Sequence, residues 1–462
     1  MAPEAENKSL LVRNAACLLT LDGPDDLLPN ASILISGGTI ERILPEGSEL
    51  PTADRIVDAE GHLVLPGLVN CHHHFYQTLT RNLPGMANAK LFDWLLYLYD
   101  IWAEMTPEDL FDASAVAAAE LLLSGCTTAL DHFYVFPHGE NSYFDAEVEG
   151  VRPTGLRFHL TRGSMSLSRK DGGLPPDSVV QTDREILDHT REVVARYHDD
   201  SFGSMLRIVP APCSPFSVTE GILRESAALA REKNLTLHTH LAETEDEEKF
   251  CQEKFGMRPV DYMEKVGWLS ENAIFAHSVW VNQDEIHRYA RHRCGIAHCP
   301  TSNMRLGSGI APIVPMLRAG VKVGLGVDGS ASNDSSHMIQ EVRQALLLQR
   351  VRYGADAISV RDALRIATKG GAEVLLRDDI GVIAPGYAAD IIGVDLKRLG
   401  YAGALADPPG VLPLCHTDRV SFSIINGRVV VEKGELLTVD LPTLIERHNG
   451  NAAALLRRAG KA

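Results

Sequence analysis

Three consecutive histidines, His72, His73 and His74, directly follow an apolar run that reads as a buried strand. In an extended chain alternate side chains share one face, so His72 and His74 point the same way and His73 points away from them. Two imidazoles on one face at the end of a strand can bind a single metal ion. The pattern predicts a metal site here, against the alternative of an exposed polar tract.

Three later apolar runs, 235–241, 273–279 and 321–330, are also rich at their ends in side chains that bind metals or transfer protons. These side chains are His240, Glu243, His277 and Asp328. Three imidazoles and one carboxylate form a mixed nitrogen and oxygen ligand set that suits zinc, or alternatively ferrous iron, and leaves one position for water. The predicted ligands of one divalent cation are His72, His74, His240 and Asp328. His238 lies deeper in its run, so we expect it to be a core histidine.

The remaining polar side chains suit proton transfer. A bound cation lowers the pKa of a coordinated water toward neutrality and supplies hydroxide. Glu243 is spaced to reach that water without binding the metal, which predicts a general acid/base, and Asp328 is placed to hold a second proton. His277 either polarises the attacked centre or donates a hydrogen bond to the tetrahedral intermediate, or it binds the metal instead, and the sequence leaves these roles open.

The sequence pattern in the middle of the chain predicts the elements that position these residues. Apolar runs alternate there with helical stretches such as 107–125, which has Pro107 at its first position and Gly125 as its stop. This alternation is typical of a parallel α/β fold, and eight such runs predict a closed (β/α)8 TIM-like barrel with its active site at the carboxyl ends of the strands. The runs are 63–72, 127–133, 156–163, 206–214, 235–241, 273–279, 295–300 and 321–330.

Both ends of the chain have a different pattern, with short strand-like segments and turn residues. Asn426-Gly427 is a strong hairpin signal near the C-terminal end. We expect the two ends to form one small β-sandwich domain. The predicted division is 1–66 for the N-terminal part of this domain, 67–374 for the barrel, 375–440 for the C-terminal part and 441–462 for a terminal helix.

Composition restricts the class of partner. The 462 residues are 45% apolar and 23% charged, and no segment approaches the roughly 18 unbroken apolar residues of a membrane helix. With 44 Lys and Arg against 61 Asp and Glu, the formal charge of −17 opposes binding to nucleic acid or anionic membranes and favours a small neutral substrate. The N-terminus has no leader pattern and the eight cysteines have no paired spacing, which predicts a reducing cytoplasm.

The motifs PGLVNCHHH, LHTHLAE, FAHS and GVDGSASND resemble the amidohydrolase superfamily, in its branch of mononuclear aminohydrolases acting on purines, pterins, cytosine and s-triazines. The resemblance covers essentially the whole chain. It implies metal ligation by His72, His74, His240 and Asp328, and proton transfer by Glu243 and His277. No lysine ends the run RIVPAPCSPFS, so the carboxylated lysine of binuclear members is absent and one metal ion per chain is expected.

Within that branch the loops HHHFYQTLTRNLP, SMSLSRKDGGLPPDSVV and HCPTSNMRLGSGIAPI are most similar to bacterial 8-oxoguanine deaminases. Gln77 matches a glutamine that guanine deaminases use on the purine edge, whereas Pro212-Cys213 stands where those enzymes carry an arginine. The resemblance therefore implies conversion of 8-oxoguanine and water to urate and ammonia. The predicted substrate-binding residues are Gln77, Cys213 and Asn303, with Arg305 as an alternative to Asn303.

Three alternatives to this function stay open. One is a hydroxyatrazine or s-triazine aminohydrolase or chlorohydrolase, and another is a deaminase of a different purine or pterin. The third is a non-catalytic dihydropyrimidinase-like scaffold, against which the complete set of site residues argues. We also expect a homo-oligomer, and we expect Trp102 and Phe75 either to stack on a flat heterocycle or to lie in the core.

Overall fold

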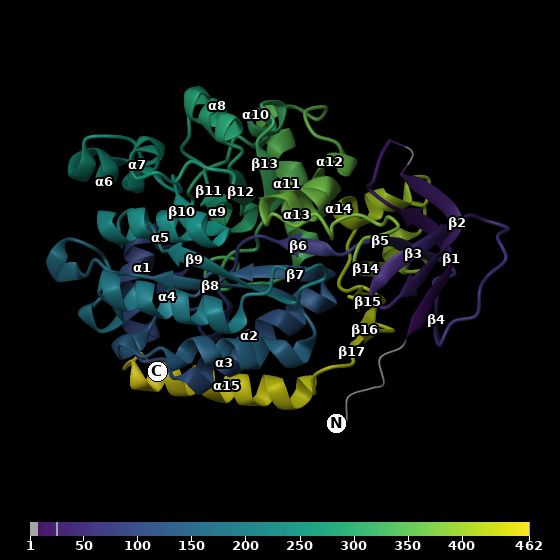
Figure 1. The fold of residues 1–462 in the computed structure, drawn as a ribbon, viewed down its shortest axis with the longest axis horizontal. Helices are drawn as coiled ribbons and strands as arrows, with labels where there is room; N and C mark the ends of the chain where they lie inside the picture. Colours follow the sequence, from purple (N-terminus) through teal and green to yellow (C-terminus); the bar gives the residue numbers. More distant parts are fainter. Residues whose placement is uncertain (1–7, 25, 462) are drawn as a thin grey trace.

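The computed structural model describes residues 8–24 and 26–461, so the expectation about a leader pattern in residues 1–7 lies outside the described residues. The described chain forms two sheets, which lie side by side in Figure 1. One is a parallel sheet from the middle of the chain, and the other combines the first and last parts, coloured purple and yellow. The predicted barrel with a β-domain from both chain ends is confirmed.

The parallel sheet has eight strands in the order β10-β11-β12-β13-β6-β7-β8-β9. The sheet curves until its two outer strands meet, where the backbone N–H of His240 donates to the carbonyl of Cys213 at 3.1 Å. The strands are β6 (Leu68–Asn70), β7 (Cys126–Asp131), β8 (Arg157–Ser164), β9 (Leu206–Pro212), β10 (Leu237–Leu241), β11 (Ala273–His277), β12 (Gly295–His298) and β13 (Lys322–Leu325).

Helices surround this sheet (Figure 1). The helix predicted from Pro107 and Gly125 begins at a capping box, in which the side chains of Thr106 and Asp109 accept each other's backbone N–H groups. The α-helices of this region are α1 (Leu91–Trp102), α2 (Pro107–Leu123), α3 (Ser142–Val151), α4 (Asp183–Tyr197), α5 (Glu220–Lys233), α6 (Glu245–Phe255), α7 (Pro259–Lys265), α8 (Gln283–His292), α9 (Pro300–Arg305), α10 (Ile313–Arg318), α11 (Met338–Tyr353), α12 (Val360–Arg365) and α13 (Gly371–Val374).

The second sheet joins strands from both chain ends, and its Asn426-Gly427 turn forms the predicted hairpin between β15 and β16. Its strands are β1 (Ser9–Leu19), β2 (Leu27–Ser36), β3 (Thr39–Leu44), β4 (Arg55–Asp58), β5 (His62–Pro66), β14 (Ile391–Asp395), β15 (Phe422–Ile425), β16 (Arg428–Glu432) and β17 (Glu435–Leu436). Among the described helices, none is long and apolar enough to cross a membrane. All eight cysteines are free thiols.

The apolar run 63–72, expected to be one strand, is divided between the two sheets. Its first part belongs to β5, which pairs with β14, and its second part is β6 of the barrel. Gly67 separates them, and a Cβ atom there would lie only 2.1 Å from the Oγ1 atom of Thr127. The expectation of a single strand was wrong because the chain passes too close to β7 at this point for any side chain.

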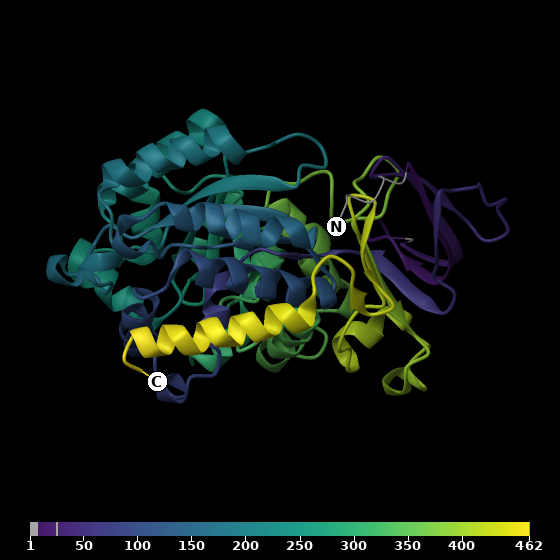
Figure 2. The same ribbon diagram turned by 90° about the horizontal axis from the view of Figure 1, so that it is seen from below.

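The last helix, α15 (Leu441–Arg458), returns from the β-domain to the barrel. Figure 2 shows it in yellow, lying along the helices on one side of the barrel. Arg447 pairs with Asp112 and Arg458 pairs with Asp109, so α15 is attached to the first turns of α2 at two points. The domain boundaries predicted from the sequence stay a prediction.

Candidate active site

The side chains predicted as metal ligands converge at the carboxyl ends of the barrel strands. The Nε2 atoms of His74 and His240 lie 3.1 Å apart, and Oδ1 of Asp328 lies 3.3 Å from Nε2 of both His72 and His74. All four residues are buried. His73 points elsewhere, as expected, and its Nε2 contacts Ser336 Oγ at 2.9 Å.

The hydrogen bonds on the far side of two rings determine which nitrogen carries the proton. Nδ1 of His74 lies 2.7 Å from the carbonyl of His132, and Nδ1 of His240 lies 2.7 Å from the carbonyl of Cys213. A carbonyl only accepts, so each Nδ1 carries a proton and each neutral ring turns a lone pair at Nε2 toward the other. Two lone pairs 3.1 Å apart repel unless a cation lies beside both. This arrangement fits a metal ion.

His72 completes the set in a different way. Its Nδ1 contacts Nε2 of His238 at 2.8 Å, while its Nε2 has no hydrogen-bond partner among the described residues. A buried nitrogen without a partner is unfavourable unless something absent from the chain satisfies it. His238, expected to be a core histidine, therefore supports His72 directly, as the outer partners of metal-binding histidines do.

The charge states suit a cation. Burial lowers the pKa of His240 to about 3, and it also lowers the pKa values of His72 and His74, so these rings are neutral at pH 7. Burial raises the pKa of Asp328, but the adjacent imidazoles, His72 above all, outweigh this effect and hold the pKa well below its usual value. Neutral imidazole and ionised carboxylate are the forms that bind metals.

His277 lies beside this set. Its Nε2 is 3.7 Å from Oε2 of Glu243 and 3.8 Å from Oδ2 of Asp328. The amide Nδ2 of Asn303 donates to its Nδ1 at 3.0 Å, so the proton of the neutral ring is on Nε2 and faces the two carboxylates. This tautomer favours a hydrogen-bonding role over metal ligation.

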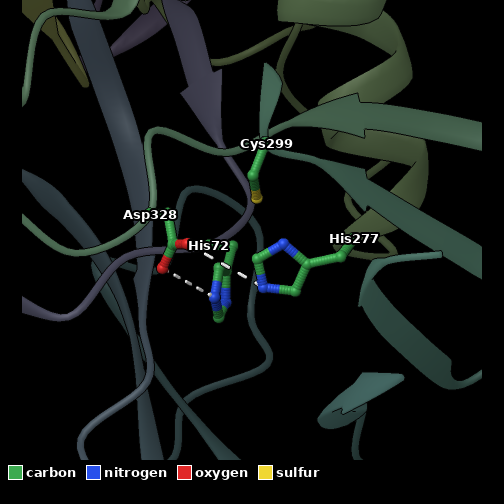
Figure 3. A group of neighbouring side chains, drawn as sticks. All are labelled: His72, His277, Cys299 and Asp328. Atoms are coloured by element: carbon green, nitrogen blue, oxygen red, sulfur yellow. Dashed lines mark ion pairs between the residues drawn. The ribbon is translucent and has the colours of Figure 1, made fainter. Parts of the chain in front are cut away.

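Figure 3 shows a second grouping of possible ligands, in which Cys299 of the β12 loop approaches His72, His277 and Asp328. Burial raises the pKa of the Cys299 thiol well above its usual value, and Sγ donates to the carbonyl of Ala297 at 3.5 Å. A thiol that keeps its proton is a poor ligand. The histidine and aspartate set is therefore the better cation site.

Three of the strand ends at the site have a strained backbone. Ala242, His277 and Asp328 have φ values of 52°, 71° and 63°, in the left-handed region that non-glycine residues rarely adopt. The backbone N–H of Asp328 donates to the carbonyl of His72 at 3.0 Å, which holds the first and last barrel loops together. Strain of this kind, about 1–3 kcal/mol per residue, is typical of functional sites.

Glu243 is the remaining acidic group at this centre. Its side chain is buried, and Oε1 accepts from Ser308 Oγ at 3.4 Å. Burial, with a further contribution from the charge of Asp328, raises the pKa of Glu243 well above its usual value. A buried carboxyl group whose pKa is raised in this way can hold a proton and pass it on, which suits an acid/base role.

A pocket opens over these groups. Gln77 and Cys213, predicted to bind substrate, line it, and Gly329 leaves room for Gln77, whose Oε1 would lie 1.8 Å from a Cβ atom there. Asn303 does not line the pocket but lies behind His277. The lining residues are His74, Gln77, Leu91, Trp94, Leu95, Tyr99, Tyr134, Cys213, Phe216, His240, Glu243, His277, Leu306, Asp328 and Ser332.

Other side chains considered for the pocket lie elsewhere. Trp102 and Phe75 are fully buried in the core, which is one of the two places expected for them, and Arg305 pairs with Asp334 at 3.0 Å. The aromatic wall is instead made by Trp94 and other residues of α1, with residues after β7 and β9. The only sequence signal for this wall is the aromatic content of 91–102, which equally fits a core helix.

Comparison with known proteins finds relatives over nearly the whole chain. The 8-oxoguanine deaminase of Pseudomonas aeruginosa is 49% identical, over 96% of this chain and 98% of that protein. The hydroxydechloroatrazine ethylaminohydrolase of Pseudomonas sp. (strain ADP) is 35% identical, over 93% of this chain and 91% of that protein. The crystal structure of an atrazine chlorohydrolase from Arthrobacter aurescens complexed with zinc superposes with a TM-score of 0.92 at 32% identity, covering 96% and 100% of the two chains.

The model of the amidohydrolase family matches residues 63–431. This span includes every strand of the barrel and all the residues that converge at its carboxyl end. The extent of this match, together with the site geometry, shows that the chain belongs to the amidohydrolase family.

Proposed function

We propose that the protein is a hydrolytic deaminase that converts 8-oxoguanine and water to urate and ammonia. The observation that carries the proposal is the convergence of three imidazole nitrogens and one carboxylate oxygen beneath a pocket that also contains Glu243. The 49% identity to a bacterial 8-oxoguanine deaminase supports the choice of substrate.

The proposed cofactor is one zinc ion per chain, held by Nε2 of three histidines and by the carboxylate of Asp328. The histidines are His72, His74 and His240. When bound, a divalent cation makes a coordinated water nucleophilic at neutral pH. The zinc in the related chlorohydrolase structure supports this ion over ferrous iron, and elemental analysis of the purified protein distinguishes the two.

Side chains of the protein carry out the proposed proton transfers. Glu243 takes one proton from water and delivers it to the ring nitrogen beside the attacked C2 atom. Asp328, through the oxygen nearer to His277, takes the second proton and delivers it to the amine, and ammonia leaves as the C2 carbonyl forms. Nε2–H of His277 donates to the oxygen added at C2, and Asn303 keeps that proton in place.

The residues that line the pocket are proposed to orient the substrate. Gln77 and Cys213 line the pocket, and we propose that Gln77 contacts the edge of the ring that carries the leaving amine. Asn303, predicted from sequence to touch the substrate, acts instead through His277. A homo-oligomer and a cytoplasmic location stay predictions, and the oligomer is tested by light scattering of the purified protein.

An s-triazine hydrolase is the second candidate, supported by the 35% identical ethylaminohydrolase and by the zinc-containing chlorohydrolase. The deciding experiment measures kcat/KM for 8-oxoguanine, guanine, isoxanthopterin and an N-ethyl hydroxytriazine, following ammonia and ethylamine. We expect 8-oxoguanine to rank first. If a triazine ranks first, the choice of 8-oxoguanine as substrate is wrong and the proposed metal site still stands. If the purified protein is inactive and contains no metal, both the substrate and the metal site are wrong.

A further inference from the structure

The pocket over the proposed ligand set is nearly closed. Its free volume is about 30 Å³, which holds only a few water molecules at about 10–15 Å³ each. Benzene is bound in a protein cavity of about 150 Å³, and a purine or a substituted s-triazine is larger than benzene. A substrate of either class therefore enters only after part of the pocket wall moves.

Residues 82–95 form the part of the wall that is least firmly attached. Leu91, Trp94 and Leu95 of this segment line the pocket from the first turns of α1, whereas residues 82–90 before them are mostly exposed. The helix α1 begins without a side-chain cap, unlike α2 and α4. An uncapped first turn leaves backbone N–H groups without a side-chain acceptor, so this turn is held less firmly than its neighbours.

Both ends of the segment are anchored. Before it, Arg81 pairs with Glu120 of α2 at 2.7 Å. After it, the guanidinium of Arg169 donates to the carbonyl of Leu96 at 3.2 Å. Between these anchors, the backbone of residues 82–95 makes its backbone hydrogen bonds locally. A segment of this kind can move as a unit without breaking the barrel.

Two side chains from the loops after β12 and β13 hold the segment against the pocket. Nη1 of Arg305 donates to the carbonyl of Ala87 at 2.9 Å, and Nε of the same side chain donates to Oδ2 of Asp334 at 3.0 Å. Oδ1 of Asp334 accepts the backbone N–H of Asn82 at 2.8 Å. The side chains of Arg305 and Asp334 are partly exposed, so water can replace these bonds at low cost.

We propose that residues 82–95 are a lid that opens to admit the substrate and release the product, and that Arg305 and Asp334 form the latch that holds the lid closed. The hydrogen bond from Nε1 of Trp94 to the carbonyl of Ala331, at 3.3 Å, breaks when the lid opens. The inference goes beyond the proposed function, because it applies to any heterocycle that the pocket binds. Closure also excludes bulk water from the reacting atoms.

The first test measures the opening itself. Arg305→Gln and Asp334→Asn each weaken the latch, and neither residue lines the pocket. Hydrogen exchange followed by mass spectrometry should show the amides of residues 82–95 exchanging about 3- to 10-fold faster in both variants. The matched control is Arg343→Gln, because Arg343 also donates to a backbone carbonyl, that of Pro413 at 3.0 Å, away from the pocket. The control should leave exchange at the lid unchanged.

The second test separates a latch from a substrate contact. With urate, the expected product, as the probe, stopped-flow tryptophan fluorescence gives the association and dissociation rate constants. A weaker latch should raise both rate constants about 3- to 10-fold and leave Kd within about twofold, because the lid obstructs entry and exit alike. A residue that touches the ligand instead changes Kd, mostly through the dissociation rate constant.

Each outcome decides one point. Unchanged exchange at residues 82–95 in both latch variants overturns the lid. If exchange is faster but the urate rate constants stay at wild-type values, this segment is not the entrance and the inference is wrong. Wild-type protein that neither binds urate nor releases ammonia from 8-oxoguanine overturns the proposed function, and the exchange measurement then decides the lid alone. Metal content and thermal midpoint of the variants distinguish lid opening from a folding defect.

Discussion

The side-chain carboxylate of Glu247 holds the backbone of Glu243 in place. Oε2 of Glu247 accepts the N–H of Glu243 and Oε1 accepts the N–H of Ala242, each at 2.9 Å. The two N–H groups turn toward one carboxylate because Ala242 is left-handed, with φ of 52°. Glu247 is fully buried in the first turn of α6, so its carboxylate fixes the orientation of the Glu243 backbone.

Replacing Glu247 with Gln should impair catalysis without removing the metal. The amide has one acceptor oxygen and places an NH2 group against a backbone N–H, so Glu243 is displaced, and a displacement of about 1 Å can cost about 100-fold in rate. We expect kcat to fall about 10- to 100-fold with normal metal content. Glu248→Gln, which alters a partly exposed pair with Arg258, is the control. A normal kcat in Glu247→Gln contradicts this role.

Removing an imidazole from the proposed ligand set should remove the metal. His240→Ala should lose stoichiometric metal and all measurable turnover, because an open catalytic site has no ligand to spare. Cys299→Ser should keep both, since the thiol stays protonated. Elemental analysis and ammonia release test the pair. Full metal content in His240→Ala shows that β10 does not supply a ligand.

Glu243→Gln should separate metal binding from proton transfer. The amide cannot accept a proton, and positioned acid/base catalysis contributes about 10²- to 10⁴-fold in rate. We expect kcat to fall by that factor, while metal content and the affinity for the product stay near wild-type values. If kcat stays near normal, the proton is carried by another group, and His277 is the first to test.

Two buried carboxyl groups outside the proposed ligand set should make stability depend on pH. Burial raises the pKa of Asp131 to about 7, and burial together with Asp131 raises the pKa of Glu147 well above its usual value. In the unfolded chain both groups titrate near about 4. Between these values the folded protein holds more protons on these groups than the unfolded chain does, so their contribution to stability is fully present below about pH 4 and is lost as the pH rises through about 7.

Asp131→Asn should make this decline shallower, because the amide does not ionise and its oxygen still accepts the N–H of Phe75, which Asp131 accepts at 2.6 Å. Denaturant unfolding at several values between about pH 5 and 8 measures the slope. Equal slopes in the two proteins mean that Asp131 is ionised throughout.

The sequence predicts the chemical centre better than the pocket around it. Each of His72, His240 and Asp328 follows an apolar run, and in a barrel the carboxyl ends of such runs meet whatever the intervening helices do. Local pattern is therefore enough to bring them together. The sequence predicted a domain boundary between residues 66 and 67, but it did not predict that the run 63–72 is split there between two sheets, because the split depends on a contact with Thr127, sixty residues later, that no local pattern records.

The contact of Asn303 with His277 and the place of Tyr99 in the pocket wall were not predicted, for a related reason. Asn303 follows a barrel strand, but the first turn of α9 directs its amide at His277 instead of the pocket. Tyr99 lies on a helix whose buried face also includes Leu98 and Trp102, and only tertiary packing places one of these side chains at the pocket. Helical periodicity identifies a buried face without identifying what it faces.

The division of one strand between two sheets also affects how the chain assembles during synthesis. β5 and β6 emerge from the ribosome early, but β6 gains its neighbour β13 only after residue 325 is made, and β5 gains β14 only after residue 395. One edge of each strand beside Gly67 therefore remains unpaired while most of the chain is translated. A nascent chain in this state is prone to mispairing, and the backbone bond between Asp328 and His72 forms only after residue 328 is made.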